Sequence, residues 1–492
     1  MSTPVTAEAA DTAAPQDPPL HYLDAVTALK LFRSGSLSPV ELLQGVIDRA
    51  GTANQAVNAL TETLFDDAMV LAREAETEYR RGGTGAAERP LLGLPVVTKE
   101  KHALAGRSFS QGLLSHAGRT AEADHPVVER IRAAGGIVHA RSTSPEFSCA
   151  TVTHSPMWGV TRNPWNLERS PGGSSGGAGA ALAAGLAPLA TASDIAGSTR
   201  LPAAFTGTVG YKAPYGRIPG LAPLSADWYR GDGPMARTVA DTALLANVMS
   251  GRHPGDHTSH GGPGALPLHY PDAGDVAGLR VALCLRLGDH PLDDAVEANT
   301  RAVAETLQAA GAVVEEIVLP WTTAEIRDTI FTHFGHILGP AMETATAGSE
   351  DTLAPYTRRF MADARAAAER RTLVDGLGTE ARIQAQLATA MDGFDVLLCP
   401  TSGAASLAAD ADYLDGITVA GTQLQHYWEG HLTAPFNIAN RCPVLAVPSG
   451  FGADGVPTGV QVVGHPFQEE SVFRAGAAIE VLRPWAGRYP QL

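Results

Sequence analysis

Apolar residues near the N-terminus recur at helical spacing, first from residue 38 to residue 47 and then over residues 66–81. The first segment has a defined start, because residues 38–41 (SPVE) form a capping box with proline at the first helical position. The pattern therefore predicts two helices in this part of the chain.

From residue 94 onward, short apolar runs alternate with helical segments. Strands are predicted at residues 94–97, 137–140, 189–192, 281–284 and 313–318, and helices at residues 126–134, 178–185 and 294–310. This alternation predicts an α/β fold with a layered sheet.

Residues 252–278 are rich in Gly, Pro, His and Asp and lack periodicity, so they are expected to form a loop. A helical segment without recognisable chemistry follows, at about residues 320–392. Buried strands are then predicted at residues 396–399, 444–447 and 460–463, with a closing helix at 468–482. The strands on either side of the helical segment can complete one sheet, so we expect a single domain over residues 21–492, with its motifs concentrated at about residues 90–220.

The net charge of the chain indicates which kinds of binding partner to expect. The chain has 492 residues, and 36 basic against 52 acidic residues give a net charge of −16. Nucleic acid and anionic membranes are therefore not expected as partners, and a small neutral or cationic substrate fits better. No apolar run approaches the roughly 18 residues of a membrane span. A homodimer remains open.

The N-terminal segment and the cysteines favour a cytoplasmic protein. Residues 1–20 are rich in Ala, Thr, Pro and acidic residues, so we expect a disordered leader and not a signal peptide. The four cysteines are far apart and form no CxxC pair, which argues against a disulfide framework.

Two loops of small residues carry the strongest chemical signal: residues 172–177 (GGSSGG) and 194–200 (DIAGSTR). Ser198 lies just beyond a predicted strand, and the backbone N–H groups of Ile195, Ala196, Gly197 and Ser198 are candidates for an oxyanion hole. An ordinary strand-to-helix turn is the alternative for this loop.

Lys99 is the candidate base. It is one of only four lysines, the other 32 basic residues being arginines that cannot release a proton. It follows an apolar strand, and ligands bind at the C-terminal ends of strands in open α/β sheets. Burial would favour the neutral amine. Lys101, two positions later, is expected to be a solvated surface residue.

These motifs are open to other interpretations. Residues 172–177 could be a flexible linker, but a P-loop is excluded because no Lys-Ser/Thr pair follows. Residues 173–177 match G-x-S-x-G, which would make Ser175 a nucleophile, but no apolar strand precedes them. His253, Asp256, His257 and His260 have loosely metal-like spacing within the long loop. We expect no metal and no cofactor.

The chain resembles the amidase signature family in several motifs spread over about residues 27–480. These are residues 93–99 (GLPVVTK), 172–177 (GGSSGG), 194–203 (DIAGSTRLPA), 210–217 (GYKAPYGR), 395–401 (DVLLCPT), 436–438 (FNI), 447–450 (VPSG) and 459–464 (GVQVVG). The resemblance implies a large mixed β-sheet covered by helices on both faces.

The resemblance also implies a Ser-cisSer-Lys triad. Ser198 would be the nucleophile, Ser174 on a cis peptide the bridging serine, and Lys99 the base. Ser175 would support Lys99 by a hydrogen bond. Asp194 and Arg200 would brace the nucleophile loop.

The chain departs from the family pattern at three positions. Ala196 replaces a glycine in the oxyanion loop, Glu100 replaces the aspartate that commonly follows the lysine, and Ala213 interrupts a Lys-Pro pair. These changes concern rate and substrate range, because every triad position is filled.

The implied activity is hydrolysis of a carboxamide to an acid plus ammonia or an amine, through a Ser198 acyl-enzyme. Residues 436–443 are similar to those of members acting on linear or cyclic amides. Two alternatives remain open: an amidotransferase subunit in a tRNA-dependent assembly, and an acyltransferase with an amine acceptor in place of water.

Overall fold

The structure is a computed structural model that describes residues 18–82 and 88–492. The leader expected at residues 1–20 lies outside this part, apart from its last three residues. Leu20 already begins a short 3-10 helix.

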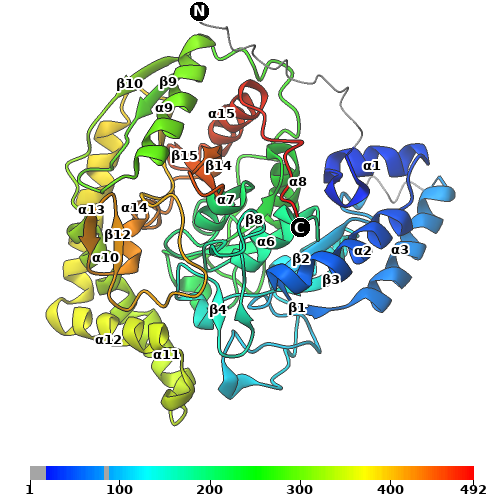
Figure 1. The fold of residues 1–492 in the computed structure, drawn as a ribbon, viewed down its shortest axis with the longest axis horizontal. Helices are drawn as coiled ribbons and strands as arrows, with labels where there is room; N and C mark the ends of the chain where they lie inside the picture. The colour runs from blue at the N-terminus through cyan, green and yellow to red at the C-terminus, as the bar shows by residue number, and fades with distance from the viewer. Residues whose placement is uncertain (1–17, 83–87) are drawn as a thin grey trace, which may run out of the picture.

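One mixed sheet of 11 strands runs through the described chain (Figure 1). In sheet order the strands are β1 (Leu60–Thr63), β3 (Ile137–Ser142), β2 (Pro95–Lys99), β6 (Leu189–Asp194), β8 (Gly231–Ala236), β7 (Val209–Lys212), β14 (Val444–Phe451), β15 (Pro457–Gly464), β11 (Val396–Pro400), β9 (Arg280–Leu283) and β10 (Val313–Glu316). The neighbours β3, β2 and β6 are parallel, as are β11, β9 and β10, whereas the strands between them pair antiparallel.

Strands from the end of the chain complete the sheet. β14, β15 and β11 lie between β7 and β9, so the segments before and after the helical middle do join one sheet, as expected. Both faces of these central strands are buried. In β14, Leu445 and Val447 belong to one hydrophobic core, while Val444 and Ala446 belong to two others.

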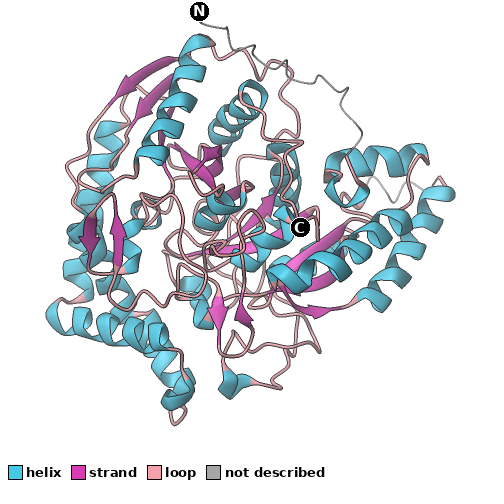
Figure 2. Cartoon of the chain, viewed as in Figure 1, coloured by secondary structure: helices cyan, strands magenta, loops and turns pink. Residues whose placement is uncertain are grey.

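Helices cover both faces (Figure 2). The core that contains Leu445 is shared with α1 (Ala25–Ser34), α5 (Pro126–Ala133), α8 (Val239–Met249), α9 (Asp294–Ala309) and α15 (Glu469–Leu482). The core around Ala446 is shared with α6 (Gly176–Ala183) and with Ala203 of α7 (Arg200–Thr206). The predicted fold class is confirmed.

Two helices pack beside the edge strand β1 and its neighbour β3, on the right of Figure 1: α2 (Pro39–Val57) and α3 (Phe65–Arg80). The predicted capping box is present at the start of α2. Ser38 Oγ accepts a hydrogen bond from the N-terminal backbone of the helix, and the Glu41 carboxylate accepts the N–H of Ser38.

The predicted helical middle is also confirmed. It consists of α10 (Thr323–His336), α11 (Leu338–Thr346), α12 (Pro355–Arg370) and α13 (Leu373–Ala390). Its inner aromatic residues, including Phe331, Phe334 and Phe360, share one core with Ile195 and Ala196. The helical middle and the loop that carries Ser198 therefore border the same hydrophobic core. No helix in residues 18–82 or 88–492 is both long and apolar enough to cross a membrane.

Candidate active site

Lys99 is the last residue of β2, as the sequence predicted, and its side chain is fully buried. The amine contacts three hydroxyl groups: Nζ lies 2.7 Å from Ser174 Oγ, 2.9 Å from Ser175 Oγ and 3.1 Å from Ser193 Oγ. No carboxylate of the described residues hydrogen-bonds to this amine. Burial, helped by the positive charge of Lys101, lowers the pKa of Lys99 well below its ordinary value. The amine of Lys99 thus loses its proton more readily than that of an ordinary lysine.

Ser174 lies in the loop that leads into α6, and the peptide bond between Gly173 and Ser174 is cis, as the resemblance implied. The loop is tightly enclosed. A Cβ atom on Gly173 would lie 2.6 Å from the carbonyl oxygen of Val152 and 2.7 Å from that of Ala150. Only glycine fits at this position without displacing backbone.

Ser175 is the N-cap residue of α6. Its hydroxyl oxygen accepts a hydrogen bond from the Lys99 amine, as expected. A loop and turns precede it where a nucleophile elbow would require a strand. The geometry therefore gives no support to Ser175 as an elbow nucleophile.

Ser198 lies in the loop between β6 and α7, and only 5% of the residue is exposed. A backbone hydrogen bond of 3.2 Å from the Ser175 N–H to the Ser198 carbonyl joins the two serine loops. Ser198 Oγ makes no hydrogen bond to the part of the chain that the structure describes. Its hydroxyl is therefore free to turn toward a reaction partner.

Asp194 organises the Ser198 loop from within. Its carboxylate accepts the N–H groups of Gly197 (2.7 Å) and Thr199 (3.2 Å) and is paired with the Arg200 guanidinium at 2.8 Å. Burial alone would raise the pKa of Asp194, but Arg200 and Asn437 lower it to about 2. A permanent buried charge thus fixes the turn.

This arrangement changes the expected set of oxyanion donors. The N–H of Gly197 is already used by Asp194. The N–H groups of Ile195, Ala196 and Ser198, by contrast, have no acceptor within residues 18–82 and 88–492. Gly197 therefore shapes the loop, and the other three groups are the available donors.

Arg200 connects the Ser198 loop to the C-terminal strands, and this link was missed in the sequence. Its guanidinium donates to the Thr433 carbonyl (2.8 Å), to Gln461 Oε1 (2.6 Å) and to Asn437 Oδ1 (2.6 Å). Asn437 and Gln461 lie in two of the motifs that carried the resemblance, which was the available signal. All of these side chains are buried.

The sequence matches the protein-family model named Amidase over residues 41–473. The chain belongs to the amidase signature family. This confirms the resemblance and, at the level of the family, the expectation of an enzyme that acts on amide carbon–nitrogen bonds.

Several relatives within the amidase signature family match almost the whole chain. An acylamidase of Rhodococcus erythropolis is 33% identical, with 96% of this chain and 98% of that protein covered. The 6-aminohexanoate-cyclic-dimer hydrolase of Paenarthrobacter ureafaciens is 32% identical, covering 96% and 97%. One subunit of the glutamyl-tRNA(Gln) amidotransferase of Chloroflexus aggregans is 31% identical, covering 96% and 99%.

The fold agrees with a solved structure of the amidase signature family, that of a bacterial aryl acylamidase. The two have a TM-score of 0.85 at 25% sequence identity, with 96% of this chain and 100% of that chain covered.

Two of the departures from the amidase signature pattern have visible structural partners. The Glu100 carboxylate accepts the N–H groups of Ser110 (2.6 Å) and Gln111 (2.9 Å), so it holds the following loop. The carbonyl of Ala196 accepts a hydrogen bond of 2.5 Å from the Thr433 hydroxyl. The Glu100 side chain is therefore integrated into its loop, whereas the bond to Thr433 uses the backbone of residue 196 and does not depend on the change from glycine to alanine.

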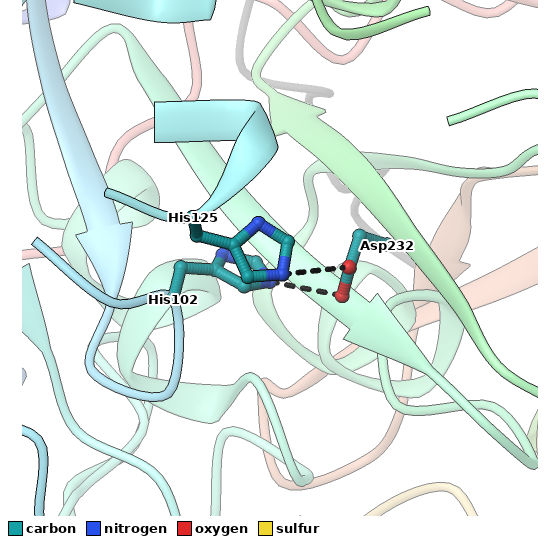
Figure 3. A group of neighbouring side chains, drawn as sticks. All are labelled: His102, His125 and Asp232. Carbon is teal, nitrogen blue, oxygen red and sulfur yellow. Dashed lines mark hydrogen bonds and ion pairs between the residues drawn. The ribbon is translucent and has the colours of Figure 1, made fainter. Parts of the chain in front are cut away.

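The expectation that Lys101 is a solvated surface residue was wrong. Only 12% of its side chain is exposed, and its amine lies 3.7 Å from Asp232 Oδ1. Asp232 also contacts two buried histidines, His102 and His125, as Figure 3 shows. No local sequence pattern indicates this group, because its members come from separate segments.

His253, Asp256 and His260 of the long loop have ordinary structural partners, whereas His257 is exposed. His253 lies 3.1 Å from Glu129, Asp256 accepts hydrogen bonds from Thr258, and His260 contacts the Tyr215 carbonyl. The only group with metal-ligand geometry in the described chain is instead His102, His125 and Asp232.

Proposed function

We propose that the protein is an amidase that hydrolyses a carboxamide through an acyl-enzyme on Ser198. The observation that carries this proposal is the buried Lys99 amine, held 2.7 Å from Ser174 Oγ beside the Ser198 loop. A lysine with a lowered pKa and a hydroxyl shell is suited to accept a proton from a serine.

The proposed reaction moves one proton along the triad and back. Ser198 Oγ attacks the amide carbon while its proton passes to Ser174 Oγ, and the Ser174 proton passes to the neutral Lys99 amine. The protons then return along the same path to the leaving nitrogen as the C–N bond breaks. Water attacks the acyl-enzyme in a second round, releases the acid and restores Ser198.

The oxyanion that forms during attack needs donors aimed at it. The available N–H groups of Ile195, Ala196 and Ser198 are the proposed donors. Asp194 and Arg200 would act through the loop by fixing its turn, without touching the substrate.

An apolar group on the substrate fits the surroundings of this loop. Ile195 and Ala196 share a hydrophobic core with Phe331 and Phe334 of α10 and with Trp428. We therefore propose an amide with an apolar acyl or amine part, in line with the acylamidase and aryl acylamidase among the relatives.

Membership of an amidotransferase is the second candidate function, because the Chloroflexus amidotransferase chain is 31% identical over nearly the whole length. Activity assays on the purified chain, alone and with partner chains, distinguish the two functions. A chain that hydrolyses simple anilides without a partner supports the amidase. A chain that is inert alone, and active on glutamine only with partner chains, supports the amidotransferase.

The decisive test is covalent labelling with a fluorophosphonate, followed by peptide mapping. We expect the label on Ser198, and folded Lys99→Ala and Ser174→Ala variants should lose labelling by at least about 100-fold. Lys30→Ala, on the exposed side of α1, is the matched control. Label on Ser175, or near-normal labelling of either triad variant, would contradict the proposed relay.

A further inference from the structure

The N–H of Lys99 is held by a side chain where the pairing of β2 with β6 stops. β2 pairs with β6 at Val96–Leu189 and Val97–Ala190, and no such pair follows in the described ladder. The N–H of Lys99 donates instead to Thr191 Oγ1, at 3.0 Å. β2 stays paired with β3 at Lys99 and Ser142, but on the β6 side the N–H of the lysine depends on the orientation of one hydroxyl group.

That hydroxyl is oriented in turn by a buried histidine and carboxylate. Thr191 Oγ1 lies 2.8 Å from His102 Nδ1, and His102 Nε2 lies 2.9 Å from Asp232 Oδ1. Burial lowers the pKa of His102, so the ring is neutral. Because Nε2 faces a carboxylate, it carries the proton, and Nδ1 accepts the hydrogen of Thr191. The Thr191 oxygen is left to accept the N–H of Lys99.

The positions of the histidine protons also argue against a metal ion held by His102, His125 and Asp232. His125 Nδ1 accepts the N–H of Val127 at the start of α5, so Nε2 carries the proton and points at Asp232 Oδ2, 3.4 Å away (Figure 3). A metal would need the lone pair of that nitrogen. Lys101, 3.7 Å from the same carboxylate, already supplies a positive charge.

Lys101 is also the charged neighbour that most disfavours a proton on Lys99. The other charged groups that act on Lys99 are Asp194 at the end of β6, and Arg230 and Asp232 at the start of β8. The pKa of Lys101 is lowered by burial but supported by Asp232, and lies at about 8. Lys101 is therefore charged below that pH.

We propose that Thr191, His102 and Asp232 position Lys99 and that Asp232 also holds the Lys101 cation in the same buried group, an inference that rests on Lys99 being the base of the proposed reaction. These are positioning residues, since each acts through Lys99 and none touches the substrate.

The first test removes the link at its centre. Thr191→Val keeps the shape of the side chain but leaves the Lys99 N–H and His102 without their shared partner, and Thr191→Ser keeps the hydroxyl. We expect the maximal rate of fluorophosphonate labelling to fall about tenfold in Thr191→Val, with the apparent binding constant unchanged, and to be restored in Thr191→Ser. Thr300→Val, which removes a buried hydroxyl that bonds only to its own helix, is the control. Equal rates in the two Thr191 variants would overturn the positioning role.

The second test uses the charge of Lys101. The labelling rate should rise with pH as Lys99 loses its proton. Lys101→Met removes a neighbouring positive charge, which should raise the pKa of Lys99. The rising part of the pH–rate profile, its acid limb, should therefore move to higher pH by about one unit. Lys101→Arg, which stays charged, should keep the limb of the wild type, as should Lys30→Met on the surface. An unmoved limb in Lys101→Met would overturn the role of this cation.

These outcomes are separable from failure of the proposed function. If Lys99→Ala labels normally, the base assignment itself is wrong. If Lys99→Ala is inert while the Thr191 and Lys101 variants behave like wild type, only the present inference fails. Stoichiometric zinc in the purified protein, with labelling lost on chelation, would also overturn it in favour of a metal site.

Discussion

The two fully buried lysines, Lys99 and Lys212, differ in their hydrogen-bond partners. The amine of Lys212 donates to Asn440 Oδ1 (2.6 Å) and to the Cys442 carbonyl (2.8 Å). Burial lowers the pKa of Lys212 to about 7, but these oxygens only accept hydrogen bonds and so oppose the loss of its proton. Lys99 contacts hydroxyl groups that can both donate and accept. Its shell is therefore compatible with a neutral amine.

Gly197 is the residue on which the shape of the Ser198 loop most depends. Its φ of +126° is rarely adopted by other residues, and a Cβ atom there would lie 2.0 Å from Thr433 Oγ1 and 2.5 Å from Thr433 Cβ. Any side chain must push the loop away from Thr433, which also holds the Ala196 carbonyl.

We therefore expect Gly197→Ala to reduce fluorophosphonate labelling of Ser198 by about 100-fold in a protein that still folds. Labelling rates and circular dichroism measure the two effects. Gly378→Ala is the control, because a Cβ at that position in α13 meets no atom within 4 Å. Labelling at the wild-type rate in Gly197→Ala would show that the loop tolerates a different turn.

At the scale of elements, the sequence predicted what is encoded locally. Continuous apolar runs predicted β2, β6 and β14, and the capping box predicted the start of α2. It did not predict β8, whose sequence GDGPMA contains two glycines and a proline. β8 is a strand because β6 and β7 pair with it on either side, a tertiary effect that overrides local propensity.

The same limit applies to the site. The residues of the proposed triad lie in contiguous motifs, so the sequence alone indicated them. Thr191, His102 and Asp232 meet only because β6 and β8 pair with Ser193 opposite Asp232. Such a contact depends on a register that the sequence does not display. The sequence predicted Ile195, Ala196, Gly197 and Ser198 alike as oxyanion donors. The hydrogen bond from the Gly197 N–H to Asp194, which only the structure shows, sets Gly197 apart from the other three.

The start of α7 yields a prediction at this scale, because Arg200 ties that helix to Asp194, Thr433, Asn437 and Gln461. Arg200→Lys keeps the charge but cannot reproduce the planar fork of donors. We expect about 3 kcal/mol less stability and a labelling rate about 100-fold lower.

Thermal unfolding and labelling rates measure this effect. Arg365→Lys is the control, because Arg365 pairs with Glu343 on the surface, where such pairs contribute little. An Arg200→Lys variant as stable and as reactive as wild type would mean that the network contributes nothing to the loop.

At the scale of the whole molecule, the end of the chain is built into the middle of the sheet. β14 and β15 lie between β7 and β11, and α15 packs on them and on α8. The Ser198 loop therefore rests on segments that follow it by more than 200 residues in sequence, as the partners Thr433 and Gln461 of Arg200 show. Local disruption of the C-terminal strands is expected to reach the site.

One carboxylate in this long-range packing should make stability depend on pH. Glu480 of α15 faces the N–H of Val239 at the start of α8, and burial, with the nearby charges of Asp241 and Asp24, raises its pKa from 4.5 to about 8. The folded protein thus keeps a proton that the unfolded chain loses above about pH 4.5. Stability from this group is present below that pH and is lost as pH rises toward 8.

Glu480→Gln cannot ionise and keeps an oxygen for the Val239 N–H. We expect the variant to resemble wild type near pH 4 and to be more stable by up to about 2 kcal/mol at pH 8, because the cost of a buried charge is removed. Melting temperatures measured from pH 4 to pH 8 at one heating rate test this. Glu305→Gln, exposed on α9, is the control and should follow wild type at every pH. If the two variants have the same pH dependence, Glu480 is ionised in the folded protein and the contact between α15 and α8 tolerates its charge.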